Sequence, residues 1–442
     1  MSNARETALR VLIGCRTKDA WADASLKSQI QRDGLTGADA ALCSRMVYGV
    51  LQNQLLLDYY LGAYCTQRTD HLQPPLLEIL RLGAYQILYL DKVPDYAAVN
   101  QSVELARLFK RGSAAGLVNA VLRKVSQNKH ALPPIPEGDI LRTLSIRYSH
   151  PRWLIKRLLP VLGPEETEEY LRINNSVAPM TVQVNTMKTT LPDLRAALER
   201  AGITVREHLW VPGCLEISGT GDLTALPAFQ EGLFLVQDPA ASLVSLAAQV
   251  TPGQRILDMC AAPGGKSFSA AIAMGDVGSI TSCDLHERKL SRIREGAGRL
   301  GITCVETAAA DGRRFEPKWE AAFDTVLVDA PCSGLGIIRK KPDVRYKKAD
   351  DLFALPVIQS ALLENAARYV RPGGLLVYST CTMLPEENQQ ITDAFLAEHE
   401  AFEREAIPLP QPVGTVSDGQ ITLWPQRHQT DGFYICRMRR HS

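Results

Sequence analysis

The sequence predicts a multidomain protein with an all-α N-terminal domain, a small α+β domain and a C-terminal α/β domain built on a mostly parallel sheet. Apolar residues recur at three- and four-residue spacing through residues 1–130, which is typical of packed helices. Short apolar runs alternate with helical stretches from about residue 240, which indicates βαβ units. A chain of 442 residues is also too long for one compact core, so two or three domains are expected.

The composition is that of an ordinary globular protein without an overall basic field. Hydrophobic residues make up 45% of the chain, charged residues make up 22%, and the formal net charge is +1. A surface that binds nucleic acid must therefore carry its positive charge locally. No apolar run reaches the roughly 18 residues of a spanning helix, and the charged N-terminus "MSNARETALRVL" does not resemble a secretory signal. We expect a cytoplasmic protein with no membrane partner.

The cysteines follow neither a disulfide pattern nor a metal-binding pattern. Ten cysteines are spread over the chain, and none form a C-x-x-C pair. The histidines are scattered as well, so the ligand spacing of a structural zinc site is missing. We expect no metal, and most of the thiols to be small buried side chains.

Residues 1–130 are predicted to form the all-α domain. The segments "ARETALRVL", "DAALCSRMVYGVLQNQLLLDYYL", "PPLLEILRLGAYQILYL", "AAVNQSVELARLF" and "GLVNAVLRKV" all show helical spacing of apolar residues. The proline-rich stretch "HALPPIPEGD" follows them and is the clearest linker in the chain.

Residues 140–235 are predicted to form the small α+β domain. Its strand-like pieces are "MTVQVN", "CLEIS" and "LFLVQD", and "LPDLRAALERAG" has the spacing of a helix. This pattern differs from that of the segments on either side, so we treat the region as a separate connecting domain.

Residues 236–442 are predicted to form the α/β domain. The apolar runs "RILDMC", "GSITSCD", "TCVETAA", "FDTVLVDA" and "GGLLVYST" alternate with helical stretches, and "ITLWP" and "FYICRMR" close the chain. Ligands of such sheets bind beyond the carboxyl ends of the strands, so functional residues should follow these runs.

The first strand end carries a glycine bend, "LDMCAAPGGKS", that can approach a ligand closely. Gly264 and Gly265 open a helix whose N-terminal amides are free to bind. A P-loop would need glycine where Cys260 stands, and a G-x-G-x-x-G motif is missing too. Neither phosphate-binding loop therefore fits.

Two aspartates end the next strands and suggest a nucleoside ligand. Asp284 can accept hydrogen bonds from a ribose, and Asp311 can lie near an adenine. The structural alternatives are a helix cap for Asp284 and a turn residue for Asp311. A ribose-binding acid beside a glycine bend, without a pyrophosphate cradle, fits S-adenosylmethionine.

Two thiols and one carboxyl group follow the fourth and fifth strands. "DAPCSG" places Asp329 and Cys332 after one strand, and "STCT" places Cys381 after the other. Enzymes that methylate amino nitrogens hold the base with a proline–aromatic pair, whereas here a thiol takes the aromatic position. Carbon 5 of a pyrimidine becomes nucleophilic once a thiolate has added to carbon 6. The alternative is two inert cysteines, and the residues alone leave open which thiol attacks.

The motifs "DMCAAPGGKS", "DAPCSG" and "STCT" together closely resemble the RNA cytosine-5 methyltransferases. The segments "ARETALRVL", "YGVLQNQLLLD", "AAVNQSVELAR" and "GLVNAVLRK" resemble the helical RNA-binding domain related to NusB. The combination is similar to bacterial 16S ribosomal RNA enzymes of the RsmB/Fmu (Sun) type, over nearly the whole chain. The resemblance implies a NusB-like domain at 1–130, a linker or RNA-binding domain at 140–235, and a Rossmann-like methyltransferase domain with a seven-stranded sheet at 236–442.

The resemblance also implies roles for individual residues. It assigns S-adenosylmethionine to Cys260, Ala261, Ala262, Pro263, Gly264, Gly265 and Lys266, with Asp284 on the ribose, Asp311 near the adenine and Asp329 between cofactor and target base. RNA enzymes of this family attack with the later cysteine, here Cys381. Cys332 then assists release of the product.

The basic run "RKKPDVRYKK" lies directly after the Cys332 loop and predicts contacts with RNA. Its candidate residues are Arg339, Lys340, Lys341, Arg345, Tyr346 and Lys347, with Tyr346 standing where relatives often have tryptophan. Basic side chains can neutralise phosphates and an aromatic ring can stack on a base. The alternative is a solvated charged loop. Secondary candidates on the helical domain are Lys110, Arg111, Arg123, Lys124 and Lys129.

We therefore expect a 16S ribosomal RNA (cytosine-5)-methyltransferase that acts as a monomer on a single-stranded or loop cytidine and not on DNA. Two alternatives remain. A transfer-RNA cytosine-5 methyltransferase shares all of the chemistry. An RNA-binding assembly or antitermination module with an inactive catalytic half would share the helical domain.

Overall fold

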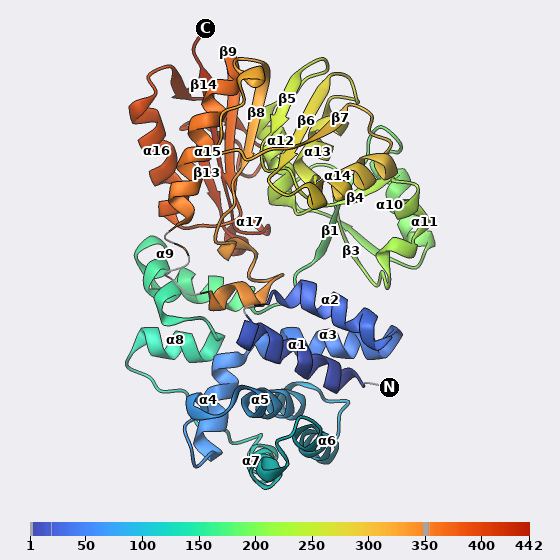
Figure 1. Cartoon of the computed structure of the whole chain (residues 1–442), viewed down its shortest axis with the longest axis vertical. Helices are drawn as coiled ribbons and strands as arrows, with labels where there is room; N and C mark the ends of the chain where they lie inside the picture. Colours follow the sequence, from blue (N-terminus) through green and yellow to red (C-terminus); the bar gives the residue numbers. More distant parts are fainter. Residues whose placement is uncertain (1–2, 19, 348–351, 353) are drawn as a thin grey trace. The chain divides into compact units, whose positions relative to one another are not determined.

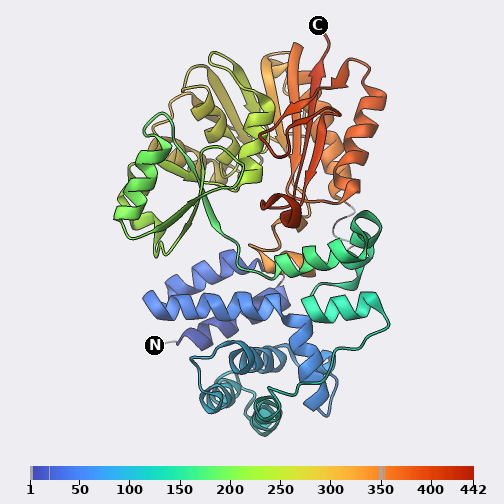
Figure 2. The same cartoon turned by 180° about the vertical axis from the view of Figure 1, so that it is seen from behind.

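The computed structural model describes residues 3–18, 20–347, 352 and 354–442, and it divides the chain into two compact units. The first unit comprises Met1–Ser176 together with Ile338–Lys347, and the second comprises Val177–Ile337 with Lys348–Ser442. Figures 1 and 2 show the elements of both units from two sides. No described helix is both long and apolar enough to cross a membrane.

The described part of the first unit contains helices and no strands, and the predicted helical N-terminal region is confirmed. Its helices are α1 (Ala4–Lys18), α2 (Ala22–Asp33), α3 (Gly37–Gln52), α4 (Gln54–Tyr64), α5 (Pro74–Tyr89), α6 (Asp95–Leu108), α7 (Ala115–Gln127), α8 (Ile140–Tyr148) and α9 (Arg152–Asn174). Helix α5 is buried along most of its length because the other N-terminal helices surround it (Figure 1). Residues 140–176 belong to this unit, although the predicted boundary at 140 assigns them to the middle domain.

Helix α5 buries charge as well as apolar side chains. The guanidinium of Arg81 lies 2.6 Å from Glu78 Oε1 and 2.6 Å from Asp58 Oδ2. Arg81 and Glu78 are both almost completely buried. Because a buried charge is costly without partners, this cluster fixes how α4 packs against α5.

The second unit begins with a small antiparallel sheet, which is the predicted α+β region. Its strands run in the order β2-β3-β1-β4 and are β1 (Met180–Val184), β2 (Thr204–Glu207), β3 (Cys214–Ser218) and β4 (Phe234–Val236). Helices α10 (Leu191–Arg200) and α11 (Pro227–Gln230) belong to the same region. Val182, Leu215 and Phe234 are fully buried in its core because alternate strand positions point inward.

The larger sheet has eight strands in the order β10-β14-β9-β8-β5-β6-β7, with β13 paired to β14. The parallel strands are β5 (Arg255–Asp258), β6 (Ser279–Asp284), β7 (Val305–Ala309), β8 (Phe323–Asp329) and β9 (Val370–Thr380). The antiparallel strands are β10 (Phe402–Arg404), β13 (Gln420–Leu423) and β14 (Phe433–Arg440). The predicted mostly parallel sheet is confirmed, and it has one strand more than the predicted seven.

Helices cover both faces of this sheet. They are α12 (Pro239–Ala248), α13 (Gly265–Ala273), α14 (Glu287–Leu300), α15 (Leu355–Tyr369), α16 (Gln389–Glu398) and α17 (Pro425–His428). Leu327 packs in the core with α12, α13 and α14, whereas its neighbours Val326 and Val328 pack in the core with α15. The short strands β11 (Ile407–Pro408) and β12 (Thr415–Val416) pair with each other. This layering leaves the carboxyl ends of β5, β6, β8 and β9 free to carry functional loops.

Candidate active site

The loop after β5 forms a glycine turn at the carboxyl edge of the sheet. The Gly264 amide donates to the Ala261 carbonyl at 2.6 Å, and the Ala261 amide donates to the Cys283 carbonyl at 2.7 Å. Gly264 has φ +111°, and an added Cβ would lie 2.4 Å from the Phe268 ring. Only glycine fits there. Helix α13 begins at Gly265, so the unpaired amides of its first turn lie beside this loop.

A cavity of about 190 Å³ lies against this turn. Seven residues predicted to bind the cofactor line it: Cys260, Ala261, Ala262, Pro263, Gly265, Lys266 and Asp329. The remaining lining residues are Val236, Gln237, Ala241 and Asp258. Gly264 shapes the turn without lining the cavity.

Two polar side chains of this cavity were missed by the sequence analysis. Asp258 is fully buried, and Gln237 is 7% exposed. The Asp258 Oδ2 atom accepts from the Ser267 hydroxyl at 2.7 Å, whereas Asp258 Oδ1 and Gln237 Nε2 have no partner. A buried acceptor and a buried donor without partners fit a polar ligand such as a nucleoside or an amino acid. Asp258 ends β5 immediately before the glycine motif, and that position was the signal available.

Asp284 and Asp311 lie at the ends of neighbouring strands but not in this cavity. The Asp284 carboxylate accepts from the His286 amide at 2.9 Å, and its carbonyl accepts from the Ala310 amide at 3.2 Å. The Asp311 carboxylate pairs with Arg313 at 2.8 Å, and the hydrogen bonds from Arg313 lower the pKa of Asp311. Contacts of the two aspartates with a ribose and an adenine remain predictions.

Asp329 joins the glycine turn after β5 to the two thiol loops. Its Oδ2 atom lies 2.5 Å from the Lys266 amine, and its Oδ1 atom accepts from the Ser379 hydroxyl at 3.0 Å. Burial alone would lower the pKa of Lys266, but the Asp329 carboxylate outweighs it and raises that pKa. The Lys266 amine also lies 5.1 Å from the centre of the Phe433 ring. Lys266 therefore stays protonated and holds Asp329 in place.

The structure brings the two thiols together. Cys332 and Cys381 follow β8 and β9, which are parallel neighbours, and their sulfur atoms lie 3.3 Å apart. Both side chains are partly buried. The hydrogen bond with Cys381 and burial both raise the pKa of Cys332 well above its ordinary value. Among the described residues, no group of three or more His, Cys, Asp or Glu side chains could hold a metal ion.

Arg345 and Tyr346, which were predicted to contact RNA, are hydrogen-bonded to other residues of the first unit. Arg345 is fully buried in the first unit, where its guanidinium donates to Asn175 Oδ1 at 2.7 Å and to four backbone carbonyls. The half-buried Tyr346 hydroxyl lies 2.8 Å from the Leu51 carbonyl. The structure therefore gives both residues a structural role, because their polar atoms already have protein partners.

The other basic residues of the run are more accessible. Lys341 is exposed, and Arg339, Lys340 and Lys347 are half-buried. The Lys347 amine lies 4.5 Å from the centre of the Trp21 ring. Lys348, the last residue of the run, lies outside the described residues. On the helical unit Lys110, Arg123 and Lys124 are exposed, Arg111 is half-buried, and the half-buried Lys129 pairs with Asp95 at 3.0 Å.

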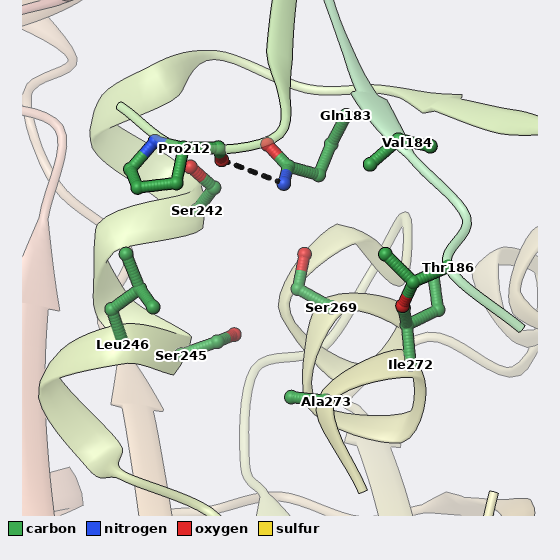
Figure 3. Close-up of a pocket in the computed structure, with 10 residues that line it drawn as sticks. All are labelled: Gln183, Val184, Thr186, Pro212, Ser242, Ser245, Leu246, Ser269, Ile272 and Ala273. Carbon is green, nitrogen blue, oxygen red and sulfur yellow. Dashed lines mark hydrogen bonds between the residues drawn. The ribbon is translucent and has the colours of Figure 1, made fainter. Parts of the chain in front are cut away.

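A second cavity, of about 160 Å³, lies away from the predicted site (Figure 3). It is bounded by residues of β1, α12 and α13, and no predicted site residue lines it. The Ser269 hydroxyl on its wall donates to Gln237 Oε1 at 2.6 Å. Because Gln237 lines the first cavity, this hydrogen bond separates the two spaces.

Comparisons with known proteins match all three regions of the chain. Residues 2–127 match the NusB family, residues 150–224 match a ferredoxin-like domain of RsmF/B-like methyltransferases, and residues 245–439 match 16S rRNA methyltransferase RsmB/F. A probable ribosomal RNA small subunit methyltransferase B of Bacillus subtilis (strain 168) is 37% identical over 446 residues, which cover 99% of both chains. The chain belongs to the RsmB/F family of 16S rRNA methyltransferases.

A further relative and a solved structure are also similar over nearly the whole chain. The ribosomal RNA small subunit methyltransferase B of Klebsiella pneumoniae (strain ATCC 700721 / MGH 78578) is 34% identical, over 90% of each chain. The crystal structure of PH0851 superposes with a TM-score of 0.83 at 27% identity and covers 99% of each chain. The predicted resemblance, the predicted fold classes and the prediction of a ribosomal RNA methyltransferase are confirmed.

Proposed function

We propose that this RsmB/F protein transfers a methyl group from S-adenosylmethionine to carbon 5 of a cytidine in 16S ribosomal RNA through a covalent bond to Cys381. The observation that carries the proposal is the pair of thiols 3.3 Å apart at the ends of neighbouring strands. Asp329 follows the same strand as Cys332 and reaches the cofactor cavity. A cytosine placed there meets a nucleophile, a second thiol and a carboxylate.

The reaction proceeds by addition and elimination. The Cys381 thiolate adds to carbon 6 of the ring, which gives carbon 5 the electron density to attack a methyl group. Bound S-adenosylmethionine supplies that methyl group as an electrophile. A base then removes the carbon 5 proton, the double bond between carbons 5 and 6 re-forms, and the bond between carbon 6 and sulfur breaks, which returns Cys381 as a thiolate. Cys332 assists this last step, since it stands beside the sulfur that leaves.

Asp329 and Lys266 position the target ring relative to the bound cofactor. The Asp329 carboxylate is fixed on one side by Lys266 and on the other by Ser379. It can therefore accept a hydrogen bond from the exocyclic amine of the cytosine without first reorganising. Asp258 and Gln237 offer the unpaired acceptor and donor that a bound cofactor would satisfy.

Substitution of the two thiols tests the mechanism. We expect Cys381→Ala to lower methyl transfer by about 10⁴-fold or more, because the nucleophile is lost. We expect Cys332→Ala to accumulate a covalent protein–RNA adduct that survives denaturing gel electrophoresis. Cys304→Ala, a partly buried thiol of the same unit, is the control and should keep full turnover. An active Cys381→Ala enzyme would overturn the assignment.

Mapping the modified base tests the substrate. We propose a cytoplasmic monomer that acts on a single-stranded or loop cytidine, because a base must leave its stack to reach two thiols. Bisulfite sequencing of RNA from a deletion strain should show the loss of one 5-methylcytosine in 16S ribosomal RNA. Loss of a transfer-RNA site instead would favour the alternative substrate. No incorporation of labelled methyl groups, with RNA binding retained, would indicate an inactive binding module.

A further inference from the structure

Two adjacent buried residues, Glu387 and Asn388, connect to the segments that carry the two thiols. They lie in the 3₁₀ turn Pro385–Glu387 and at the residue preceding α16, a few positions after Cys381. Glu387 is 1% exposed and Asn388 is fully buried. Neither residue lines the cofactor cavity, and the mechanism above uses neither of them.

Glu387 is linked to the residues on both sides of Cys332, to Ser333 directly and to Pro331 through Gln359. Its Oε2 atom accepts from the Ser333 amide at 2.8 Å and from Gln359 Nε2 at 3.0 Å. The same Gln359 nitrogen donates to the Pro331 carbonyl at 3.0 Å. The backbone immediately before and immediately after Cys332 is thus fixed by one carboxylate, directly through Ser333 and indirectly through Gln359.

Asn388 is bonded to the residues on both sides of Cys381. Its Oδ1 atom accepts from the Thr380 hydroxyl at 2.6 Å, and its Nδ2 atom donates to the Thr382 carbonyl at 3.0 Å. Both threonines are fully buried, so these bonds are shielded from bulk solvent. The Ser333 and Thr382 hydroxyls, 2.7 Å apart, join the two arrangements.

This arrangement is costly to build if it serves packing alone. A buried carboxylate bonded only to neutral donors loses much of its hydration energy, and Glu387 Oε1 has no partner at all. A reactive side chain has to be held in place by the residues that support it, and this requirement accounts for the cost. The pKa of Cys332 is raised by the hydrogen bond with Cys381 and by burial, and the negative charge of Glu387 raises it further. Cys332 therefore stays protonated.

We propose that Glu387 and Asn388 are separate positioning residues, Glu387 for Cys332 and Asn388 for Cys381. The inference rests on the proposed function, because it assigns each of them to one half of the addition–elimination reaction. Asn388 serves the addition of sulfur to carbon 6, and Glu387 serves the release of the methylated product. Loss of each residue should therefore imitate the loss of its own thiol.

The test compares turnover with adduct formation on transcribed 16S ribosomal RNA in the presence of S-adenosylmethionine. Glu387→Ala should lower turnover at least tenfold and accumulate a denaturation-resistant adduct, as Cys332→Ala does. Asn388→Ala should lower turnover at least tenfold without any adduct, as Cys381→Ala does. If the two residues had a purely structural role, both variants would lose turnover and adduct together. Adduct would then not accumulate in Glu387→Ala alone.

Conservative variants keep the test valid if an alanine variant fails to fold. Glu387→Gln keeps one acceptor, and Asn388→Asp keeps the acceptor for Thr380 but loses the donor to Thr382. Each should change turnover and adduct formation in the same direction as its alanine variant, but by a smaller factor. Its affinity for S-adenosylmethionine should be unchanged. Gln390→Ala, at an exposed position two residues after Asn388, should match the parent enzyme.

Three outcomes would overturn the proposals, and they are distinguishable. If Cys332→Ala accumulates adduct but no Glu387 variant does, the role of Glu387 is wrong. If both Asn388 variants turn over like the parent enzyme, or accumulate adduct, the role of Asn388 is wrong. If Cys332→Ala itself forms no adduct, the proposed function fails, and this inference fails with it.

Discussion

Asp258 and Asp276 are two carboxyl groups in the catalytic unit whose surroundings shift their pKa values in opposite directions. Burial raises the pKa of Asp258 to about 6, despite the hydrogen bond from Ser267. Asp276 accepts bonds from the Thr303 and Cys304 amides at 2.9 Å, and these outweigh its desolvation and lower its pKa. The first carboxyl lines the cavity beside the glycine turn, and the second binds the backbone amides of a loop.

Asp258→Asn should therefore change how stability depends on pH. Between the unfolded value of 3.8 and about 6, the folded protein keeps the Asp258 proton that the unfolded chain has lost. Stability declines as pH rises through that window, by about 3 kcal/mol in all. The free energy of unfolding of Asp258→Asn, minus that of the parent, should rise by about this amount from pH 4 to pH 7 in denaturant titrations.

Asp276→Asn is the control of opposite sign. A carboxyl with a lowered pKa contributes stability above its unfolded value and loses it as pH falls. The free energy of unfolding of Asp276→Asn, minus that of the parent, should be negative at pH 7, and its magnitude should decrease as the pH falls. A pH-independent difference for Asp258→Asn would contradict the raised pKa of this buried carboxyl.

At the scale of elements, the thiol loops after β8 and β9 are locked together by two glycines. The Gly336 amide donates to the Cys381 carbonyl at 2.9 Å, and the Gly432 amide donates to the Gly336 carbonyl at 2.9 Å. A Cβ added at Gly336 would lie 1.8 Å from the Gly432 carbonyl oxygen. No side chain fits there without moving the backbone that carries Cys381.

Gly336→Ala should consequently impair chemistry more than folding. A displacement of about 1 Å at a reacting group can cost about 10²-fold in rate, so we expect a loss of that order in single-turnover methyl transfer. Gly298→Ala in α14 is the matched control, since an added Cβ there meets nothing within 4 Å. It should keep full activity and gain up to about 1 kcal/mol in stability. Parent-like turnover by Gly336→Ala would contradict the close approach of the two loops.

Elements were easier to predict than the contacts between them. Strand–helix alternation predicted the parallel sheet because apolar periodicity is a local signal, and adjacent strand ends predicted the meeting of Cys332 and Cys381. Arg345 was predicted to contact RNA and is fully buried instead, and its acceptors, which extend from Gln52 to Asn175, are too distant in sequence to be foreseen. The role of Glu387 likewise depends on partners at Ser333 and Gln359 that no motif reveals.

At the scale of the whole molecule, the chain leaves the catalytic unit five residues after Cys332 and contributes Ile338–Lys347 to the helical unit. This segment is part of the helical fold. Asp343 accepts from the amide of Ala22 at the start of α2 at 3.0 Å, and Arg345 bonds to carbonyls near the ends of α3, α8 and α9. The N-terminal helices therefore depend on residues that are encoded within the catalytic half.

Arg345→Ala and Lys341→Ala should separate folding from RNA binding. Removal of the buried guanidinium leaves several carbonyls without donors and should lower the free energy of unfolding by on the order of 3 kcal/mol. Lys341→Ala, at an exposed position, should change stability by less than about 0.5 kcal/mol. It should instead weaken RNA binding and reduce the slope of log affinity against log salt concentration by about 1, as expected for the loss of one phosphate contact. The reverse pattern would restore Arg345 as an RNA contact.

The covalent bond between Cys381 and the target base is the central claim, and mass spectrometry of a trapped complex tests it most directly. RNA that carries 5-fluorocytidine at the modified position lacks the carbon 5 proton, so elimination stops and the adduct persists. After digestion, the account predicts that the nucleotide is attached to the peptide that contains Cys381, with one added methyl group. Attachment to Cys332, or no covalent adduct with fully methyl-active enzyme, would contradict it.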